Sequence, residues 1–348
     1  MKLFDVIKQI QPLNKEVMKN VSEYIDNLTK PAGSLGRIEE LAIQIAGITG
    51  NERPTVKNPA IVICAGDHGI VEEGVSAFPQ EVTKLMINNF IQGGAAINVF
   101  ARQIGAKVTV VDVGVKGEIT SDKVVCKKVK HGTNNFLHED AMTEEEAIRA
   151  IETGMEVADE LIDAGHELLI TGEMGIGNTT ASSALIAAYT NEPVEKVVGF
   201  GTGLDEIGHR RKIEVIKKAL ESRQVNKEET LKTFAKVGGL EIGALAGVIL
   251  QGAARKVPVI VDGLISSAAA LVAFELCPTV SEHIIISHQS VEPGQAALFK
   301  YLKKKPLLNL DLRLGEGTGA ALSYPLVDAA CRMVSEMATF SDIGLEKR

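Results

Sequence analysis

Residues 167–180, ELLITGEMGIGNTT, combine the features from which the architecture of this protein can be predicted. The first five residues contain the apolar run LLI at 168–170, as in strands that are buried on both faces of a parallel sheet. Glycines at 172, 175 and 177 follow, and Asn178 then begins a helical pattern that continues to Tyr189. A buried strand, a glycine-rich turn and a helix in this order indicate an α/β protein.

Further β-branched runs of the same kind alternate with segments long enough for crossover helices. With 167–171, we expect strands at 60–64, 107–113, 123–129, 196–200, 257–261 and 283–287. Thr143 and Glu146 form a capping box that starts a helix ending before Gly165. Other helices are expected in the first 50 or so residues and at 79–104, 178–189, 293–302 and 317–340.

The composition argues against several classes of protein. The 348 residues include 45 acidic and 37 basic side chains, a net charge of −8, whereas a protein that binds nucleic acid needs a basic surface. The chain has no long uncharged apolar run, so we expect neither a membrane span nor a signal peptide. Its four cysteines form no CxxC pair, which is typical of a cytoplasmic protein.

Small and polar residues cluster directly after five of the expected strands. Ligands of parallel sheets bind at the carboxyl ends of the strands, so these loops predict one composite site. The loops are 65–69, 172–180, 201–205, 262–263 and 288–294, and the segment 313–319 near the C-terminus has the same character.

The 172–180 loop has the features of a phosphate-binding turn. Its glycines permit close backbone approach, and the free N–H groups of the following helix favour an anion. The lysine of a P-loop and the spacing of a dinucleotide fingerprint are both absent. Lys212 could add a positive charge to the same phosphate. The alternative is an ordinary glycine-rich turn with an Asn178 cap, and a solvated Lys212.

Glu316 is a candidate general base. It lies between two glycines in the stretch 314–323, which has no other charged side chain. A carboxylate in a poorly solvated loop has a raised pKa and can accept a proton near neutral pH. The alternative is a turn carboxylate that caps the helix beginning near Thr318.

Two other kinds of site have weaker support. Asp67 and His68 follow one strand and His288 follows another, but the sequence lacks the three or four spaced ligands of a metal site. A triad of Ser290, His68 and Asp262 lacks the GxSxG elbow of α/β-hydrolases. We therefore expect no metal and no cofactor.

Nine stretches, collinear over nearly the whole chain, resemble the nicotinate-nucleotide–dimethylbenzimidazole phosphoribosyltransferases, which make the lower-ligand nucleotide of cobalamin. The two most specific are GEMGIGNTTASSAL at 172–185 and LDLRLGEGTGAAL at 310–322. Family members often have a histidine after SxEPG, where this chain has Gln295. The remaining stretches are 30–42, 65–70, 74–83, 89–102, 201–205, 261–271 and 287–294.

The resemblance implies a doubly wound, mostly parallel sheet flanked by helices, in a homodimer. We expect a large α/β domain at 55–315 and a small helical domain built from 1–54 and 316–348. The implied reaction transfers ribose 5-phosphate from nicotinate mononucleotide to 5,6-dimethylbenzimidazole. Its products are α-ribazole 5′-phosphate, nicotinate and a proton.

The resemblance also implies roles for single residues. Glu316 of the LGEG motif serves as general base, and Lys212 with the 172–180 loop holds the phosphate. The expected nucleotide-binding residues are Glu173, Gly175, Gly177, Asn178, Thr179, Thr180, Gly201, Lys212 and Ser290. An apolar slot for the acceptor base is expected from Phe78, Gln80, Met86, Met174 and Leu314, although each of these could instead belong to the core.

This chemistry fits the residues. Nicotinate leaves the pyridinium nucleotide with a neutral ring nitrogen, so no general acid is needed. The attacking benzimidazole would become a cation unless a base removes its ring proton, which is the role assigned to Glu316. Attack on the opposite face of the ribose inverts the anomeric configuration from β to α.

Two other functions are distinguishable. A non-catalytic nucleotide-binding protein would keep the phosphate loop and lose the base, whereas the GEG motif around Glu316 is intact. A dinucleotide-dependent oxidoreductase would carry GxGxxG after its first strand, and AGDHGI at 65–70 lacks that spacing.

Overall fold

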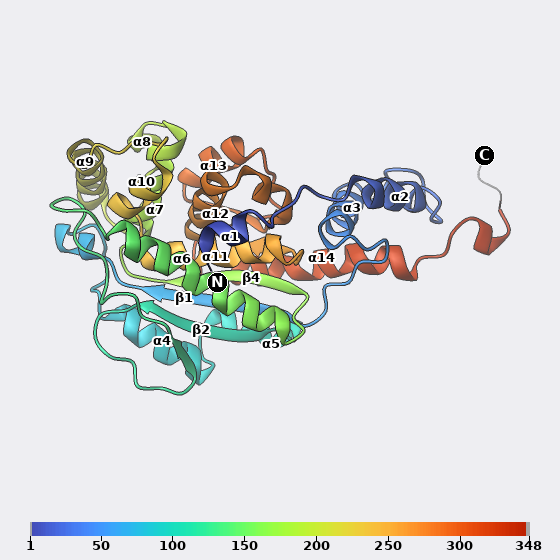
Figure 1. The fold of residues 1–348 in the computed structure, drawn as a ribbon, viewed down its shortest axis with the longest axis horizontal. Coiled ribbons are helices and arrows are strands. Elements are labelled where there is room, and N and C mark those ends of the chain that lie inside the picture. The colour runs from blue at the N-terminus through green and yellow to red at the C-terminus, as the bar shows by residue number, and fades with distance from the viewer. Residues whose placement is uncertain (1, 346–348) are drawn as a thin grey trace.

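A six-stranded, all-parallel sheet forms the centre of the molecule in the computed structural model, which describes residues 2–345 (Figure 1). The strand order is β3-β2-β1-β4-β5-β6, the order of doubly wound folds. The order reverses between β1 and β4, and such folds bind ligands outside the carboxyl ends of the strands near that point. The strands are β1 (Pro59–Gly66), β2 (Lys107–Gly114), β3 (Val124–Cys126), β4 (Leu168–Met174), β5 (Val259–Val261) and β6 (Ile284–Ile286).

Alternate side chains of β1 enter two separate cores. Ala60, Val62 and Cys64 face the helices on one side of the sheet, and Ile61 and Ile63 face those on the other. The first side carries α6 (Glu144–Asp163), α11 (Leu240–Ala254) and α12 (Leu264–Leu276), and the second carries α4 (Val82–Gln92), α5 (Ala96–Ile104) and α14 (Thr318–Glu336). Burial on both faces explains why the strands are continuous apolar runs rather than alternating ones.

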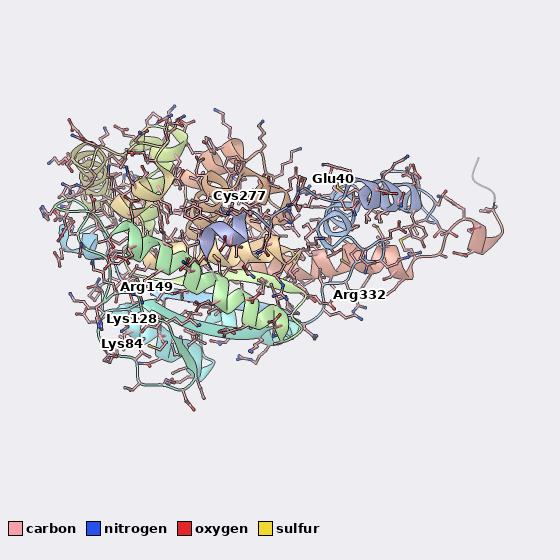
Figure 2. The ribbon with its side chains drawn as sticks, in the orientation of Figure 1. Glu40, Lys84, Lys128, Arg149, Cys277 and Arg332 are labelled. Atoms are coloured by element: carbon pink, nitrogen blue, oxygen red, sulfur yellow. The ribbon has the colours of Figure 1, made fainter. Side chains whose placement is uncertain are left out.

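The remaining helices surround these layers. Charged side chains such as Lys84, Arg149 and Arg332 project outward from the helices named above (Figure 2).

No helix among residues 2–345 combines the length and the apolar character that crossing a membrane requires. The remaining helices are α1 (Leu3–Ile7), α2 (Lys15–Ile25), α3 (Arg37–Thr49), α7 (Asn178–Thr190), α8 (Val194–Val197), α9 (Glu206–Ser222), α10 (Thr230–Val237) and α13 (Gly294–Leu302).

Helices from the two ends of the chain lie together. α2 and α3 pack on each other and on α14, and they extend with the far half of α14 from one end of the molecule (Figure 1). The short α1 instead packs on α6 and α11, with Leu3 and Val6 in the core of the large body. The division into domains at 1–54, 55–315 and 316–348 stays a prediction.

The structure corrects the sequence-based elements in three places. The strand expected at 196–200 is wrong, because Pro193 starts the short helix α8 and the buried Val197 and Val198 fill the helical core instead of pairing in a sheet. The helix expected at 79–104 is two helices, because Gly93 ends α4 at φ +80°. The strand expected at 123–129 is only the three residues of β3.

A second sheet was not expected from the sequence. It pairs β7 (His288–Ser290) with β8 (Leu308–Leu312) in parallel. These two short strands carry the 288–294 and 313–319 segments to the edge where β4 and β5 end. The extra sheet therefore completes the wall of the site described next.

Candidate active site

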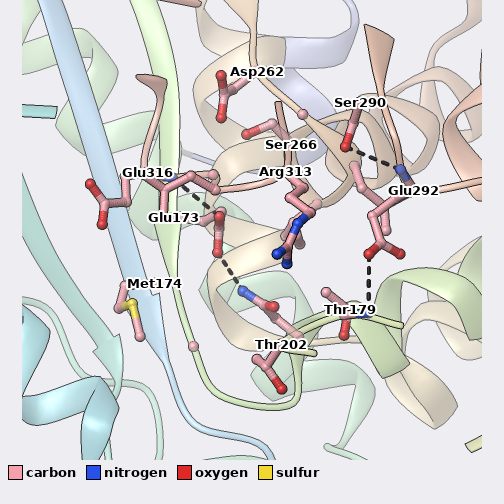
Figure 3. A pocket seen from close by; sticks show the side chains of 18 of the residues that line it. Glu173, Met174, Thr179, Thr202, Asp262, Ser266, Ser290, Glu292, Arg313 and Glu316 are labelled. Atoms are coloured by element: carbon pink, nitrogen blue, oxygen red, sulfur yellow. Dashed lines mark hydrogen bonds between the residues drawn. The ribbon is translucent and has the colours of Figure 1, made fainter. Parts of the chain in front are cut away.

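A cavity of about 280 Å³ opens at the carboxyl ends of β4 and β5 (Figure 3). Its wall includes Glu173 and Met174 from the end of β4 and Asp262 after β5. Ser290 of β7 and Glu316 before α14 close the opposite part. The structure thus brings four of the predicted loops, and the segment at 313–319, to one site.

The N-terminus of α7 forms one part of this wall. Asn178 and Thr179 line the cavity as the first helical residues, so Gly177, at φ +95°, is the N-cap and not Asn178. Lys212 lies directly behind them, because its Nζ donates to the Thr179 Oγ1 at 2.8 Å. Lys212 is completely buried, so the solvated-lysine alternative is wrong. Burial lowers the pKa of this ammonium to about 8.

Other expected nucleotide-binding residues surround the same end of the cavity. Gly175, Gly201 and Ser290 line it. Gly201 accommodates Lys212 and Thr179, since a Cβ there would lie 3.1 Å from the lysine Nζ and 2.9 Å from the threonine Oγ1. Thr180 lies outside the lining, buried, and its hydroxyl has no hydrogen-bond partner among the described residues.

Glu173 and Glu316 are joined through the backbone. The N–H of Glu316 donates to Glu173 Oε1 at 3.3 Å, and the Asn178 side chain donates to the other oxygen of Glu173. Burial and the nearby carboxylates of Asp262 and Glu241 raise the pKa of Glu173 to about 8. At neutral pH Glu173 is therefore mostly a neutral acid.

The Glu316 carboxylate lies at the N-terminus of α5. Its Oε2 accepts the N–H of Ile97, the second residue of that helix, at 3.3 Å. Glu316 is buried, and burial raises the pKa of its carboxyl, with a further increase from Asp262 and an opposing effect of the Ile97 hydrogen bond. The carboxylate is thus held in place and made more basic, as a general base requires.

Asp262, rather than Glu316, caps α14. Its carboxylate accepts the N–H groups of Gly317 at 3.1 Å and Ala320 at 2.9 Å. The interpretation of Glu316 as a cap for that helix is therefore wrong. Burial raises the pKa of Asp262, while His288 and these backbone N–H groups act in the opposite direction.

The residues of the expected base slot divide into two groups. Phe78, Met86, Met174 and Leu314 all line the cavity, and Phe78 and Leu314 are more than half exposed at its mouth. Gln80 lies outside the lining, and its side-chain amide donates to the backbone oxygen of His68 at 3.1 Å. Gln80 therefore braces the loop that carries Phe78.

Neither alternative site forms. His68 Nε2 lies 2.7 Å from Glu241 Oε1 in a fully buried pair, so His68 is committed to Glu241 and the Ser290–His68–Asp262 triad is wrong. His288 bonds Ser287 Oγ at 2.8 Å. No group of three or more potential metal ligands occurs among residues 2–345.

Gln295 has a structural position in this chain. Its side-chain oxygen accepts the N–H of Ser290, and its amide nitrogen donates to Ser267 Oγ at 3.2 Å. Gln295 is fully buried and does not line the cavity, so it ties α13 to β7 and α12.

Sequence reasoning missed several lining residues. Glu292 accepts the Gly201 N–H at 3.0 Å, and Arg313 projects among the lining side chains (Figure 3). Glu292 lies in the 288–294 loop, which follows an expected strand, and Arg313 lies in the 313–319 segment of the same small and polar character, so loop composition was the available signal. The lining residues without an assigned binding role are Val82, Ile176, Thr202, Asp262, Gly263, Leu264, Ile265, Ser266, His288, Glu292, Arg313 and Gly315, of which Asp262 and His288 were considered only for the triad and the metal site.

Comparison with known proteins agrees with this geometry. The family described as phosphoribosyltransferase matches residues 10–345. The chain is 53% identical over 347 residues to the nicotinate-nucleotide–dimethylbenzimidazole phosphoribosyltransferase of Chloroflexus aggregans, covering 99% of this chain and 98% of that one. The chain belongs to this phosphoribosyltransferase family.

Other members of the phosphoribosyltransferase family support the same assignment. The enzyme of that name from Halalkalibacterium halodurans is 49% identical, over 99% of this chain and 96% of its own. The crystal structure of the phosphoribosyltransferase from Thermus thermophilus has a TM-score of 0.92 at 44% identity, over 97% of this chain and 100% of that one. The doubly wound sheet is therefore the fold of a solved phosphoribosyltransferase.

Proposed function

We propose that this phosphoribosyltransferase transfers ribose 5-phosphate from nicotinate mononucleotide to 5,6-dimethylbenzimidazole, in cobalamin biosynthesis. The products are α-ribazole 5′-phosphate, nicotinate and a proton. The observation that carries the proposal is the position of Glu316, whose buried carboxylate lies in one cavity with apolar side chains and with an open helix N-terminus.

The donor phosphate is assigned to the N-terminus of α7. Backbone N–H groups and the helix dipole favour an anion there. Lys212 donates a hydrogen bond to Thr179 and so places a positive charge behind this N-terminus. The negative charge of Glu292 favours the charged form of Lys212, but among residues 2–345 no hydrogen bond joins these two side chains. A buried ammonium without a bonded anionic partner is destabilised, and a bound phosphate would relieve that cost.

The acceptor base is assigned to the slot formed by Met86, Met174 and Leu314, with Phe78 at its mouth. The flat benzimidazole buries its apolar faces there and directs one ring nitrogen toward the ribose. Its other nitrogen carries the proton that Glu316 accepts as the new N–C bond forms. Nicotinate leaves from the opposite face, so the anomeric configuration inverts from β to α. Orientation of the two rings supplies a further part of the rate.

A product assay tests this proposal. The protein is mixed with nicotinate mononucleotide and 5,6-dimethylbenzimidazole, and the products are separated by chromatography. Equal amounts of free nicotinate and an α-linked ribazole phosphate are expected. Tight binding of the mononucleotide without release of nicotinate would show a different acceptor or a non-catalytic protein.

The assembly and location belong to the same proposal. We propose a homodimer, which light scattering of the purified protein tests by its mass. We also propose a cytoplasmic location, to which four free cysteines are suited. Fractionation of the producing cells tests the second point.

A further inference from the structure

The side chain of Thr202 bridges two loops of the cavity wall. Its Oγ1 accepts the N–H of Ala77 at 2.9 Å and lies 3.2 Å from Ser76 Oγ. Among residues 2–345, no other hydrogen bond joins the loop at 74–80 to the loop at 199–205. One hydroxyl group therefore makes the whole hydrogen-bonded connection between these loops.

The loop that carries Thr202 lies against the proposed phosphate site. Gly201 packs so closely on the Lys212–Thr179 pair that a Cβ there would lie 3.1 Å from the lysine Nζ and 2.9 Å from the threonine Oγ1. The N–H of Gly201 donates to Glu292 Oε1 at 3.0 Å. Figure 3 shows Thr202 and Thr179 at the same end of the cavity. A phosphate that orders the Lys212–Thr179 pair therefore also orders the backbone that leads into Thr202.

The loop on the other side of Thr202 carries Phe78 to the mouth of the proposed acceptor slot. Phe78 lines the cavity but is 52% exposed, so packing alone holds its ring only in part. Its N–H donates to Ser76 Oγ at 3.2 Å, and the Ser76 hydroxyl donates to Phe78 O at 3.0 Å. Because the single proton of Ser76 is used in this way, Thr202 is the donor in its bond to Ser76. Thr202 thus holds the turn from which Phe78 projects.

The backbone on both sides of Thr202 is free to turn. Gly201 and Gly203 flank it at φ +54° and +103°, in conformations that glycine adopts without strain. A Cβ built on Gly203 would meet no other atom within 4 Å. The side-chain bonds of Thr202, rather than its own backbone, therefore fix how the two loops meet.

We propose that Thr202 is a positioning residue that couples the two substrates, because it holds Phe78 over the acceptor base when the donor phosphate is bound. The inference rests on the proposed function, which places the phosphate at α7 and the acceptor base beside Phe78. An aromatic ring that covers a flat base removes apolar surface of both from water. The acceptor base therefore binds more tightly once the donor is in place. Such coupling is reciprocal, so the acceptor raises the affinity for the donor by the same factor.

Calorimetry with an unreactive pair of ligands tests the proposal. Ribose 5-phosphate has the phosphate and the sugar of the donor but no leaving base, so it can be present with 5,6-dimethylbenzimidazole without turnover. Saturating ribose 5-phosphate is expected to raise the affinity of the wild type for dimethylbenzimidazole at least about fivefold, the lower end of typical coupling between sites. Saturating dimethylbenzimidazole should raise the affinity for ribose 5-phosphate by the same factor.

T202V removes the hydroxyl and keeps the β-branched shape of the side chain. It should bind each ligand alone within about twofold of the wild-type affinity, and neither ligand should then raise the affinity for the other. The exposed N–H of Ala77 can bond to water in this variant, so T202V should fold. T202S is the matched control, because it keeps Oγ and should keep the coupling.

A double-mutant cycle with F78A tests whether Thr202 acts through Phe78. F78A should lose the coupling although Thr202 is intact, and T202V/F78A should match F78A in every affinity. Coupling that persists in F78A and disappears in T202V would show that Thr202 acts on another part of the wall, and would overturn the positioning of Phe78.

Other results would overturn the link itself. These are wild-type protein that binds the two ligands independently, and T202V that keeps the coupling of the wild type. Weaker binding of ribose 5-phosphate alone by T202V would make Thr202 a part of the phosphate site instead of a link. Failure of the proposed function is seen separately, as wild-type protein that couples these two ligands but releases no nicotinate from nicotinate mononucleotide.

Discussion

Replacing Glu316 with glutamine is expected to slow the chemical step about 100-fold or more, because general-base catalysis typically contributes about 10²–10⁴-fold. This range equals about 2.7–5.4 kcal/mol of activation free energy, at about 1.36 kcal/mol for each factor of ten. The glutamine has the same length, and its side-chain oxygen can still accept the Ile97 N–H. The lost charge at the start of α5 contributes only ~0.3–1 kcal/mol to stability, so E316Q should fold and bind both substrates.

The assay is single turnover by rapid quench, with both substrates saturating and nicotinate as the measured product. In the wild type the rate should fall as the pH falls through the raised pKa of Glu316, because only the carboxylate accepts a proton. E316Q should show no such dependence. A variant whose rate stays within about tenfold of the wild type at about pH 8 would refute the assignment of Glu316 as the base.

Glu173→Gln is the matched control, because it changes the neighbouring carboxyl in the same way. The pKa of Glu173 is about 8, so the wild-type side chain is already mostly neutral near pH 7. The glutamine oxygen can replace only one of the two Glu173 oxygens that accept from Glu316 N–H and Asn178, so E173Q loses one neutral hydrogen bond, which contributes about 1 kcal/mol. E173Q should therefore lose less than about tenfold in rate at neutral pH, and an equal loss in both variants would contradict distinct roles for the two residues.

Four further predictions concern charged residues at or next to this cavity. K212M should weaken nicotinate mononucleotide about tenfold or more in calorimetry and leave nicotinic acid riboside, which lacks the phosphate, unchanged; an equal loss for both ligands would contradict the phosphate site. Because the pKa of Lys212 is about 8 in the folded protein and 10.5 when unfolded, wild-type stability should rise between pH 8 and 10.5, and urea unfolding of K212M should lack that slope. D262N should lower the free energy of unfolding by ~1–3 kcal/mol, since two N–H groups of α14 lose their charged acceptor, and an unchanged urea midpoint would refute the cap. The raised pKa of Glu173 means that the folded protein holds the proton of this carboxyl between pH 4.5 and 8, where the unfolded chain has lost it. The free energy of unfolding of the wild type should therefore fall as the pH rises through that window, and that of E173Q should change less.

The sequence predicted the sheet well because its strands are buried on both faces. The runs at 60–64 and 167–171 lie almost wholly within β1 and β4, but these strands continue to Gly66 and Met174, so the start of each expected loop is strand. The run at 196–200 failed for a related physical reason, since a short β-branched segment packs equally well into a helical core. The break at Gly93 was visible only as a pair of glycines inside a helical pattern.

The site was predicted where its residues follow strands and missed where packing alone creates a contact. Glu316 could be identified from its glycine-flanked motif, but its partner Ile97 lies 219 positions earlier and has no polar side chain. The bond between His68 and Glu241 spans 173 positions, so spacing along the chain could not reveal it. The role of Asp262 as a helix cap likewise depends on how α14 returns to the sheet.

The two kinds of wall in this cavity differ in how readily mutation can alter them. The carboxylates of Glu316 and Asp262 meet helix starts, and the same is proposed for the donor phosphate; the donors there are main-chain N–H groups, which almost every amino acid retains. The proposed acceptor slot consists of ordinary side chains such as Met86, Met174 and Leu314, each of which a single codon change can reshape. Selection can therefore exchange one flat acceptor for another over generations while the handling of the donor nucleotide is inherited unchanged.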